Sequence, residues 1–232
     1  KMIEDGMDIL DIGGYSSKPG AKRISSKIEI SRILPTLIFL RKTYPKLIIS
    51  IDTFRSDIAK ICLNEGADII NDISSGELDE KMIKIISDFN CPYIMMHMSG
   101  NPQNMQKSPK YKDVVIELIN YLAKKVKFAR DNGIVDLVID PGFGFGKTIQ
   151  HNYQLLNNLD KFKILDIPML VGFSRKSMIY KTLKTNAENS LNGTTCLNTI
   201  ALTKGANILR VHDVKQAKEC IILYEKINNA LI

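Results

Sequence analysis

Short apolar runs recur along the chain, and each ends on a polar or charged cluster. Apolar runs of this length bounded by turn residues are typical of buried strands. The pattern predicts strands near residues 8–12, 47–52, 68–72, 92–97, 137–140, 168–173 and 208–211. Buried strands that each deliver a chemical group at the carboxyl end are typical of the catalytic face of a (β/α)8 TIM barrel. We therefore expect the function to lie in these clusters.

Segments with helical spacing of apolar residues separate the predicted strands. The spacing predicts helices over residues 26–44, 57–65, 79–88, 112–132, 152–162, 190–204 and 214–232. Gly66 and Gly205 each follow one of these helices at the position where glycine commonly ends a helix. Strict alternation of strand and helix predicts a parallel sheet of the α/β class.

The pattern contains seven strands, whereas a complete barrel of this class has eight. The chain opens at residues 4–8, which read as the end of a helix just ahead of the first strand. We expect the first β-strand to be missing from the numbered sequence, by truncation or by lack of order. A seven-stranded barrel or an open doubly wound sheet is the alternative. Residues 1–232 contain no Pro-, Gly- or Ser-rich linker, which favours a single, N-terminally incomplete domain.

The composition is that of a globular protein with an excess of cations. Hydrophobic residues make up 44% of the 232 residues, enough for a substantial core, and the net charge is +7. The cations are scattered along amphipathic stretches such as residues 116–130, so a solvated face is favoured over a nucleic-acid footprint. A positive cleft that attracts an anionic small molecule remains compatible with this charge.

Cysteine spacing and the N-terminal residues indicate the cellular compartment of the protein. Cys62, Cys91, Cys196 and Cys220 are far apart and form no C-x-x-C pair, so we expect buried free thiols in a reducing compartment. Residues 1–6 contain no apolar signal core, and no run reaches membrane-spanning length. The sequence therefore predicts a cytoplasmic protein with no membrane partner and no nucleic-acid partner.

Three polar residues at strand ends indicate a site for a flat heterocycle. Asp52, Asn71 and Asp140 lie at the carboxyl ends of predicted strands, and a glycine-rich loop follows Asp140. That loop does not match the phosphate-loop pattern, because Pro141 stands where a glycine is required. It does not match the dinucleotide pattern either, because Lys147 stands where the last glycine is required. Each feature alone also fits a helix cap or a tight turn. Together, two carboxylates and an amide suit a ring rich in N–H donors and reject analogues that lack them.

Two further clusters indicate an anion site. Residues 174–177 place Arg175 and Lys176 between two serines at a predicted helix start, and Arg210 and His212 share one face of the last strand. A solvated basic turn is the alternative. His97 fits either the core or the barrel mouth, and His151 lies at a helix start on the surface. The spacing of histidines and cysteines shows no metal site, and no Ser/His/Asp arrangement can be argued.

These clusters, in this order, resemble the dihydropteroate synthases, the folate-pathway enzymes that sulfonamides target. The resemblance covers essentially the whole chain and rests on residues 11–21 (DIGGYSSKPGA), 50–53 (SIDT), 66–72 (GADIIND), 96–98 (MHM), 140–147 (DPGFGFGK), 174–177 (SRKS) and 210–213 (RVHD). It implies condensation of 6-hydroxymethyl-7,8-dihydropterin diphosphate with 4-aminobenzoate to 7,8-dihydropteroate and diphosphate, assisted by Mg2+. It also implies a homodimer formed through barrel helices.

The resemblance assigns roles to individual positions. It implies catalytic roles for Asp52, Asp140 and Lys176, pterin binding by these three with Asn71 and Phe145, diphosphate binding by Ser17, Arg210 and His212, and aminobenzoate binding by Lys18, Arg175 and Ser177. The asparagine that binds Mg2+ in the family would lie upstream of Lys1, so no metal ligand is expected in this chain. We expect a fragment without that strand to be inactive.

One segment departs from the family pattern. Residues 15–18 read Tyr-Ser-Ser-Lys, where the family usually has an acidic residue, Ser, Thr and Arg. Lys18 is a point charge rather than a planar fork, so its anion contacts are expected to be weaker. Two alternatives remain open. A methyltetrahydrofolate methyltransferase-type barrel would share the pterin carboxylates without needing the two cationic clusters, and a non-catalytic pterin-binding paralogue would fit the change at Lys18.

Overall fold

The strands of the computed structural model all pair in parallel. It describes residues 1–18, 20–106 and 109–230. Its strands are β1 (Ile9–Gly13), β2 (Ile48–Asp52), β3 (Ile69–Asp72), β4 (Tyr93–Met96), β5 (Leu137–Asp140), β6 (Leu170–Val171) and β7 (Ile208–Leu209). The first five form one sheet in chain order, β6 pairs with β7, and a parallel bridge between Ile139 and Met169 joins the two groups. All seven predicted strands are confirmed.

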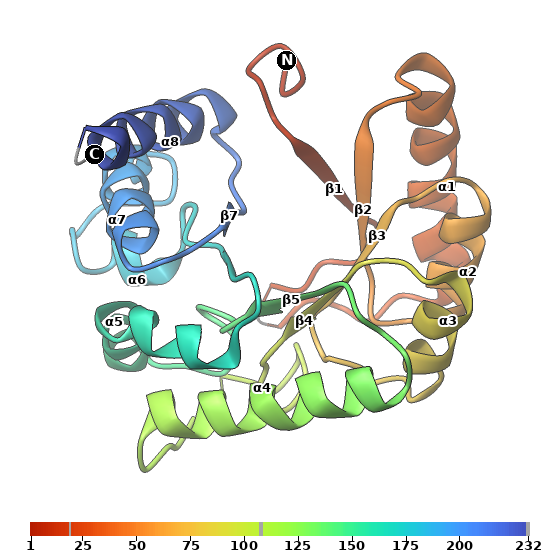
Figure 1. Cartoon of the computed structure of the whole chain (residues 1–232), viewed down its shortest axis with the longest axis horizontal. Coiled ribbons are helices and arrows are strands. Elements are labelled where there is room, and N and C mark those ends of the chain that lie inside the picture. The colour runs from red at the N-terminus through yellow and green to blue at the C-terminus, as the bar shows by residue number, and fades with distance from the viewer. Residues whose placement is uncertain (19, 107–108, 231–232) are drawn as a thin grey trace.

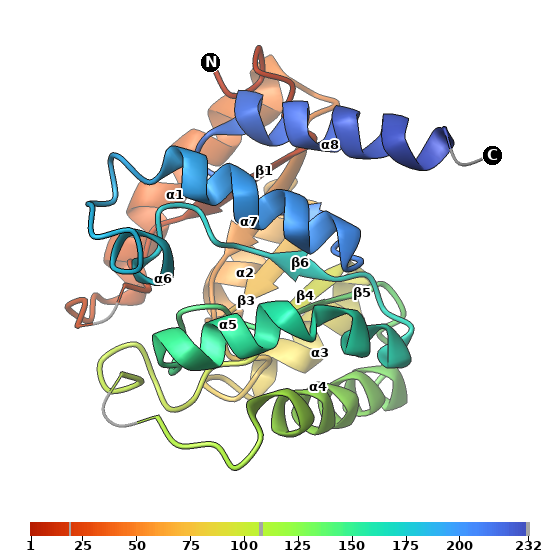
Figure 2. The same ribbon diagram turned by 90° about the vertical axis from the view of Figure 1, so that its left-hand side faces the viewer.

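The helices lie outside the strands, as Figures 1 and 2 show. They are α1 (Ser26–Thr43), α2 (Ser56–Asn64), α3 (Lys81–Phe89), α4 (Val114–Asp131), α5 (Ile149–Asn157), the 3-10 helix η1 (Leu159–Leu165), α6 (Ser177–Tyr180), α7 (Leu191–Thr203) and α8 (Val214–Asn229). The helix predicted over 152–162 begins earlier and continues as η1. The helix predicted over 214–232 ends at Asn229, and residues 231–232 lie outside the described residues.

Strand order distinguishes a barrel from the doubly wound alternative. Neighbouring strands follow chain order from β1 to β7 without the reversal that defines a doubly wound sheet. Within the described ranges β7 and β1 do not pair, and a pocket of about 500 Å3 opens between β1, β7 and α8. The fold is therefore of the (β/α)8-barrel class, with seven strands described and the position between β7 and β1 open.

An apolar layer inside the strands sets the position of the polar residues above it. Six strands contribute one member each: Ile9, Ile69, Ile94, Val138, Leu170 and Ile208. Side chains two positions apart on a strand share a face. Each strand therefore directs the residue two positions after its layer member toward the same interior, at the carboxyl end. The larger apolar cluster packs the opposite strand faces against the surrounding helices.

Two expectations from the sequence concern the cysteines and membrane-spanning segments. Cys62, Cys91 and Cys220 are buried free thiols as expected, but Cys196 is exposed on α7, so the expectation was wrong for that residue. Cys196 falls on the solvent side of α7, whereas the neighbouring Leu197 is buried. Among the described helices, none has the length and apolar character that crossing a membrane requires.

Candidate active site

The candidate residues meet because they follow the interior apolar layer by two positions. Asn71, Asp140 and Arg210 follow Ile69, Val138 and Ile208 in this way, and Asp11 follows Ile9. Asp52 enters at the same height, because its backbone pairs with Asn71 on one side and Gly13 on the other. The expected convergence at one mouth is thus confirmed for these strands.

Arg210 lies at the centre of an ion-pair network in this mouth. Its Nε donates to Asp11 Oδ2 at 2.7 Å, and its Nη2 donates to Asp52 Oδ2 at 2.8 Å. Asn71 Nδ2 donates to the same Asp11 oxygen at 3.1 Å. Burial, and then the charge of Asp11, raise the pKa of Asp52 to about 7, while Arg210 opposes the shift. The network holds an excess of negative charge in a partly dehydrated site.

Asp140 and Lys176 form a second charged pair of the mouth. Asp140 accepts a 2.7 Å hydrogen bond from the Gly142 amide, and burial raises its pKa, while the charge of Lys176 opposes this. Lys176 Nζ donates to Phe143 O at 2.5 Å and lies 4.9 Å from the Phe145 ring centroid. Burial lowers the pKa of Lys176 to about 8, an effect that Asp140 opposes and Arg210 reinforces. Asp140 and Arg210 each follow an interior apolar residue by two positions, so the two open onto the same end of the barrel.

A buried lysine supports the glycine-rich loop from below. Lys147 Nζ lies 2.8 Å from Gly142 O, 2.9 Å from Phe145 O and 3.1 Å from His97 Nδ1. His97 is 8% exposed and stacks edge-on against Tyr121 at 4.7 Å between ring centroids. The structure therefore places His97 beneath the loop, in the buried support of the site. Burial and the charge of Lys147 lower the pKa of His97 to about 3, so the ring is neutral.

The anion-side residues form a separate group at the end of β6 and β7. His212 Nδ1 lies 2.8 Å from Ser174 Oγ, and burial followed by the charge of Arg210 lowers the pKa of His212. The charge of Lys18, in the β1–α1 loop, acts on the pKa of His212 in the same direction. Helix α8 begins at Val214, as predicted, directly after these residues.

The remaining predicted residues lie around this group, and they differ in the contacts that they make. Arg175 donates from Nε and Nη2 to the two oxygens of Asp213, at 3.1 and 2.7 Å, and so joins the β6–α6 loop to the start of α8. Ser177 is the first residue of α6. Ser17 is half-buried and Lys18 is exposed in the β1–α1 loop. The binding roles of these four residues stay predictions.

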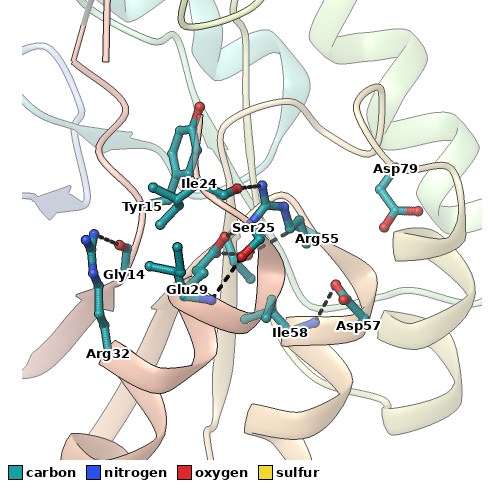
Figure 3. A network of polar contacts seen from close by, with 12 residues as sticks. Gly14, Tyr15, Ile24, Ser25, Glu29, Arg32, Arg55, Asp57, Ile58 and Asp79 are labelled. Atoms are coloured by element: carbon teal, nitrogen blue, oxygen red, sulfur yellow. Dashed lines mark hydrogen bonds and ion pairs between the residues drawn. The ribbon is translucent and has the colours of Figure 1, made fainter. Parts of the chain in front are cut away.

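A buried ion pair anchors the loop that carries Ser17 and Lys18 (Figure 3). Arg55 Nη1 donates to Glu29 Oε2 at 2.5 Å, and Arg55 Nη2 donates to Ile24 O at 2.6 Å. Thr53, directly after Asp52, donates its hydroxyl to the other oxygen of Glu29 at 2.7 Å. The Arg55 guanidinium also faces the ring of Tyr15 at 5.6 Å. Contacts from α1 and the β2–α2 loop thus hold the β1–α1 loop on both sides.

Four polar residues of this region were not among the predicted site residues. Asp11 was overlooked although its position two residues after Ile9 matches the spacing of Asn71 after Ile69. The alternation rule could have found it. Lys147 and the Glu29–Arg55 pair could not be found in this way, because their partners lie 50 and 26 positions away in the chain.

Comparison with known families agrees with this geometry. Residues 1–212 match the family model described as pterin binding enzyme. The dihydropteroate synthase of Escherichia coli is 39% identical over 227 residues, which cover 97% of this chain and 79% of the relative. The dihydropteroate synthase of Synechocystis is 39% identical over 92% of this chain and 75% of its own length.

Solved structures show the same similarity. A Yersinia pestis dihydropteroate synthase in a sulfonamide drug complex superposes with a TM-score of 0.95 at 35% identity, over 98% of this chain and 83% of that one. A Xanthomonas albilineans dihydropteroate synthase with 4-aminobenzoic acid gives a TM-score of 0.91 at 33% identity, over 98% and 81%. With interior carboxylates, an amide and cations arranged at one barrel mouth, the chain belongs to the dihydropteroate synthase family of pterin-binding enzymes.

Proposed function

We propose that the protein condenses 6-hydroxymethyl-7,8-dihydropterin diphosphate with 4-aminobenzoate, and that different residues of this mouth bind the pterin ring, the diphosphate and the aminobenzoate. The bond between the pterin methylene carbon and the diphosphate oxygen breaks, and its electron pair leaves with diphosphate. The amine nitrogen of aminobenzoate forms a new bond to that carbon and then loses a proton to solvent. The products are 7,8-dihydropteroate and diphosphate.

The observation that carries this proposal is the meeting of a negatively charged ring site and a cationic group in one mouth. Asp52, Asn71 and Asp140 supply acceptors and an amide for the ring, and Asp52 and Asp140 stabilise the positive charge that develops as diphosphate leaves. Arg210 and His212 lie beside the start of α8, where donors favour an anion. Because diphosphate leaves before the neutral arylamine attacks, the reaction requires no strong general base.

Lys176 and Phe145 close the ring site on one side. Lys176 Nζ lies against the Phe145 ring and donates to Phe143 O, which leaves further N–H donors of the ammonium for a ring acceptor. The glycines of this loop let the backbone approach closely: a Cβ on Gly144 would lie 3.3 Å from the Lys176 side chain. We assign Ser17 to the diphosphate, and Lys18, Arg175 and Ser177 to the aminobenzoate, on the family resemblance.

Magnesium remains a proposal that rests on the family resemblance alone. Among the residues described, no three or more His, Cys, Asp or Glu side chains form a group that could hold a metal ion. The donors of this mouth also do not fit such a site, since two of its carboxylates are committed to Arg210. No step of the proposed reaction is therefore assigned to a metal.

We also propose a homodimer and a cytoplasmic location. Helix α8 exposes Leu223 and Ile227, each 64% exposed and one turn apart, and α7 exposes Ile200. Apolar side chains on neighbouring outer helices support a self-complementary dimer surface. A Leu223→Glu, Ile227→Glu variant is expected to elute as a monomer by light scattering, whereas an unchanged mass would contradict this surface. The unpaired thiols support a reducing compartment.

The activity test follows diphosphate release and pteroate formation by the full-length natural protein, given both substrates. We expect both products in equal amounts, loss of both in Asp140→Asn, and no change in Asp8→Asn, a matched variant whose carboxylate is 73% exposed. Equal affinity for the pterin with and without diphosphate, together with no product, would overturn the proposal. That outcome would favour a methyltransferase-type barrel, which handles no diphosphate.

A further inference from the structure

Among the described carboxylates of the mouth, Asp11 is the one to which the reaction above gives no role. It is the third residue of β1, and its side chain is only 17% exposed. Its Oδ2 accepts two hydrogen bonds, from Arg210 Nε at 2.7 Å and from Asn71 Nδ2 at 3.1 Å. A single oxygen therefore bonds to one residue assigned to the pterin and one assigned to the diphosphate.

We propose that Asp11 is a positioning residue that couples the ring site to the anion site, an inference that rests on the proposed function. Through one oxygen it sets the direction of the Asn71 amide, and through the same oxygen it sets the plane of the Arg210 guanidinium. Its negative charge also acts on Asp52. Asp11 thus determines how tightly the site binds the pterin when the diphosphate is already bound, and how tightly it binds the diphosphate when the pterin is already bound.

The geometry of Arg210 shows how this positioning works. Asp11 and Asp52 together occupy the edge of the guanidinium formed by Nε and Nη2. Within the described residues Nη1 has no hydrogen-bond acceptor, and the side chain is 45% exposed. The two carboxylates hold Arg210 by one edge and leave the other end toward solvent, where it can donate to an anion. Loss of Asp11 removes half of this hold.

Charge gives Asp11 a second effect, on the neighbouring carboxylate. The charges that act on Asp52 are those of Asp11 on β1, Arg210 after β7, Asp72 on β3 and Glu29 on α1. Three of these four groups are acids, and among them Asp11 has the largest effect in raising the pKa of Asp52. Ionised Asp52 offers both oxygens as acceptors to the N–H groups of a pterin, whereas the protonated carboxyl would present a donor of its own, so its ionisation sets the acid limb of ring binding.

Two substitutions separate the charge of Asp11 from its hydrogen bonds. In Asp11→Asn the amide oxygen can stay in the place of Oδ2, and the amide nitrogen can take the place of Oδ1, which is buried and has no partner within the described part of the chain. That variant removes the charge and keeps both bonds. Asp11→Ala removes both. Asp8→Asn, just ahead of β1 and paired with Lys218 at 3.1 Å, is the matched control.

The test measures binding of 6-hydroxymethylpterin and of its diphosphate ester to the full-length protein by calorimetry between pH 5.5 and 8.5. In Asp11→Asn we expect the acid limb of pterin binding to move to lower pH, because a like charge beside Asp52 is gone. In Asp11→Ala we expect affinity for the diphosphate ester to fall roughly tenfold, the effect of one charge-assisted hydrogen bond. Asp8→Asn should change neither.

A double-mutant cycle decides whether Asp11 and Arg210 act together in binding the diphosphate ester. In an Arg210→Ala background, Asp11→Ala should change diphosphate-ester affinity less than about twofold, because its partner is already gone. Equal effects of Asp11→Ala with and without Arg210, or an unmoved acid limb in Asp11→Asn, would overturn the inference. Failure of the wild-type protein to bind either ligand would instead refute the proposed function, so the two failures are distinguishable.

Discussion

Replacing Arg55 by methionine should destabilise the protein, because it leaves the Glu29 carboxylate buried without its cation. Glu29 is 0% exposed, and Arg55 supplies its only charged partner among the described residues, at 2.5 Å (Figure 3). Removing one member of a buried ion pair costs about 3–5 kcal/mol, since the remaining charge is uncompensated. The Thr53 hydroxyl still donates to Glu29 at 2.7 Å, so we expect the lower half of that range.

The loss should depend on pH in a defined direction. Burial already raises the pKa of Glu29 in the folded protein, and without Arg55 the pKa rises further. A carboxyl whose folded pKa exceeds its unfolded value binds more protons when folded, so stability falls as pH rises between the two values. Below the unfolded pKa this penalty is absent. Arg55→Met should therefore lose more stability at pH 8 than at pH 5.5.

Urea unfolding followed by circular dichroism at both pH values measures the effect. The double variant Glu29→Gln, Arg55→Met removes the buried charge as well, and we expect it to be about 2 kcal/mol more stable than Arg55→Met at pH 8, with little pH dependence. A loss below about 1 kcal/mol in Arg55→Met at pH 8, or equal losses at both pH values, would refute this account of the pair. Limited proteolysis should also show faster cleavage within residues 15–25, which Arg55 anchors through Ile24.

Three further predictions follow from the site. Asp140→Asn should weaken pterin binding by about 2–4 kcal/mol in calorimetry, because an amide donor then faces the donors of the ring; unchanged affinity would remove Asp140 from the site. Gly142→Ala should lower the melting temperature far more than Gly20→Ala: both have positive φ, but a Cβ would lie 2.0 Å from His97 O in the first and meets nothing within 4 Å in the second. Equal shifts would show that backbone strain alone matters. Lys147→Met should lower the free energy of unfolding by about 2–4 kcal/mol in denaturant titration, because three carbonyl oxygens and His97 lose their donor. A smaller decrease than the same substitution causes at an exposed lysine such as Lys84 would contradict this.

The strand-end residues predicted from sequence are those whose position depends on where a buried strand ends, whereas roles for loop residues such as Ser17 and Phe145 came from the family resemblance. Asn71, Asp140 and Arg210 follow apolar strand residues, and parallel strands of a barrel bring their carboxyl ends to one mouth whatever the details of packing. Asp52 was found for the same reason. His97 remained ambiguous, because the strand pattern alone does not show whether the loop after Asp140 covers the end of the neighbouring strand.

What the amino-acid order determined by itself was the set of elements, their parallel arrangement and the chemical groups at the strand ends. What only the tertiary structure decided was which of those groups touch. The pairing of Arg210 with Asp11 and Asp52 joins residues 199 and 158 positions apart, and the Glu29–Arg55 pair depends on how α1 packs beside the β2–α2 loop. Periodicity is a local property of the backbone, whereas such contacts depend on side-chain packing between distant segments, which no short stretch of sequence encodes.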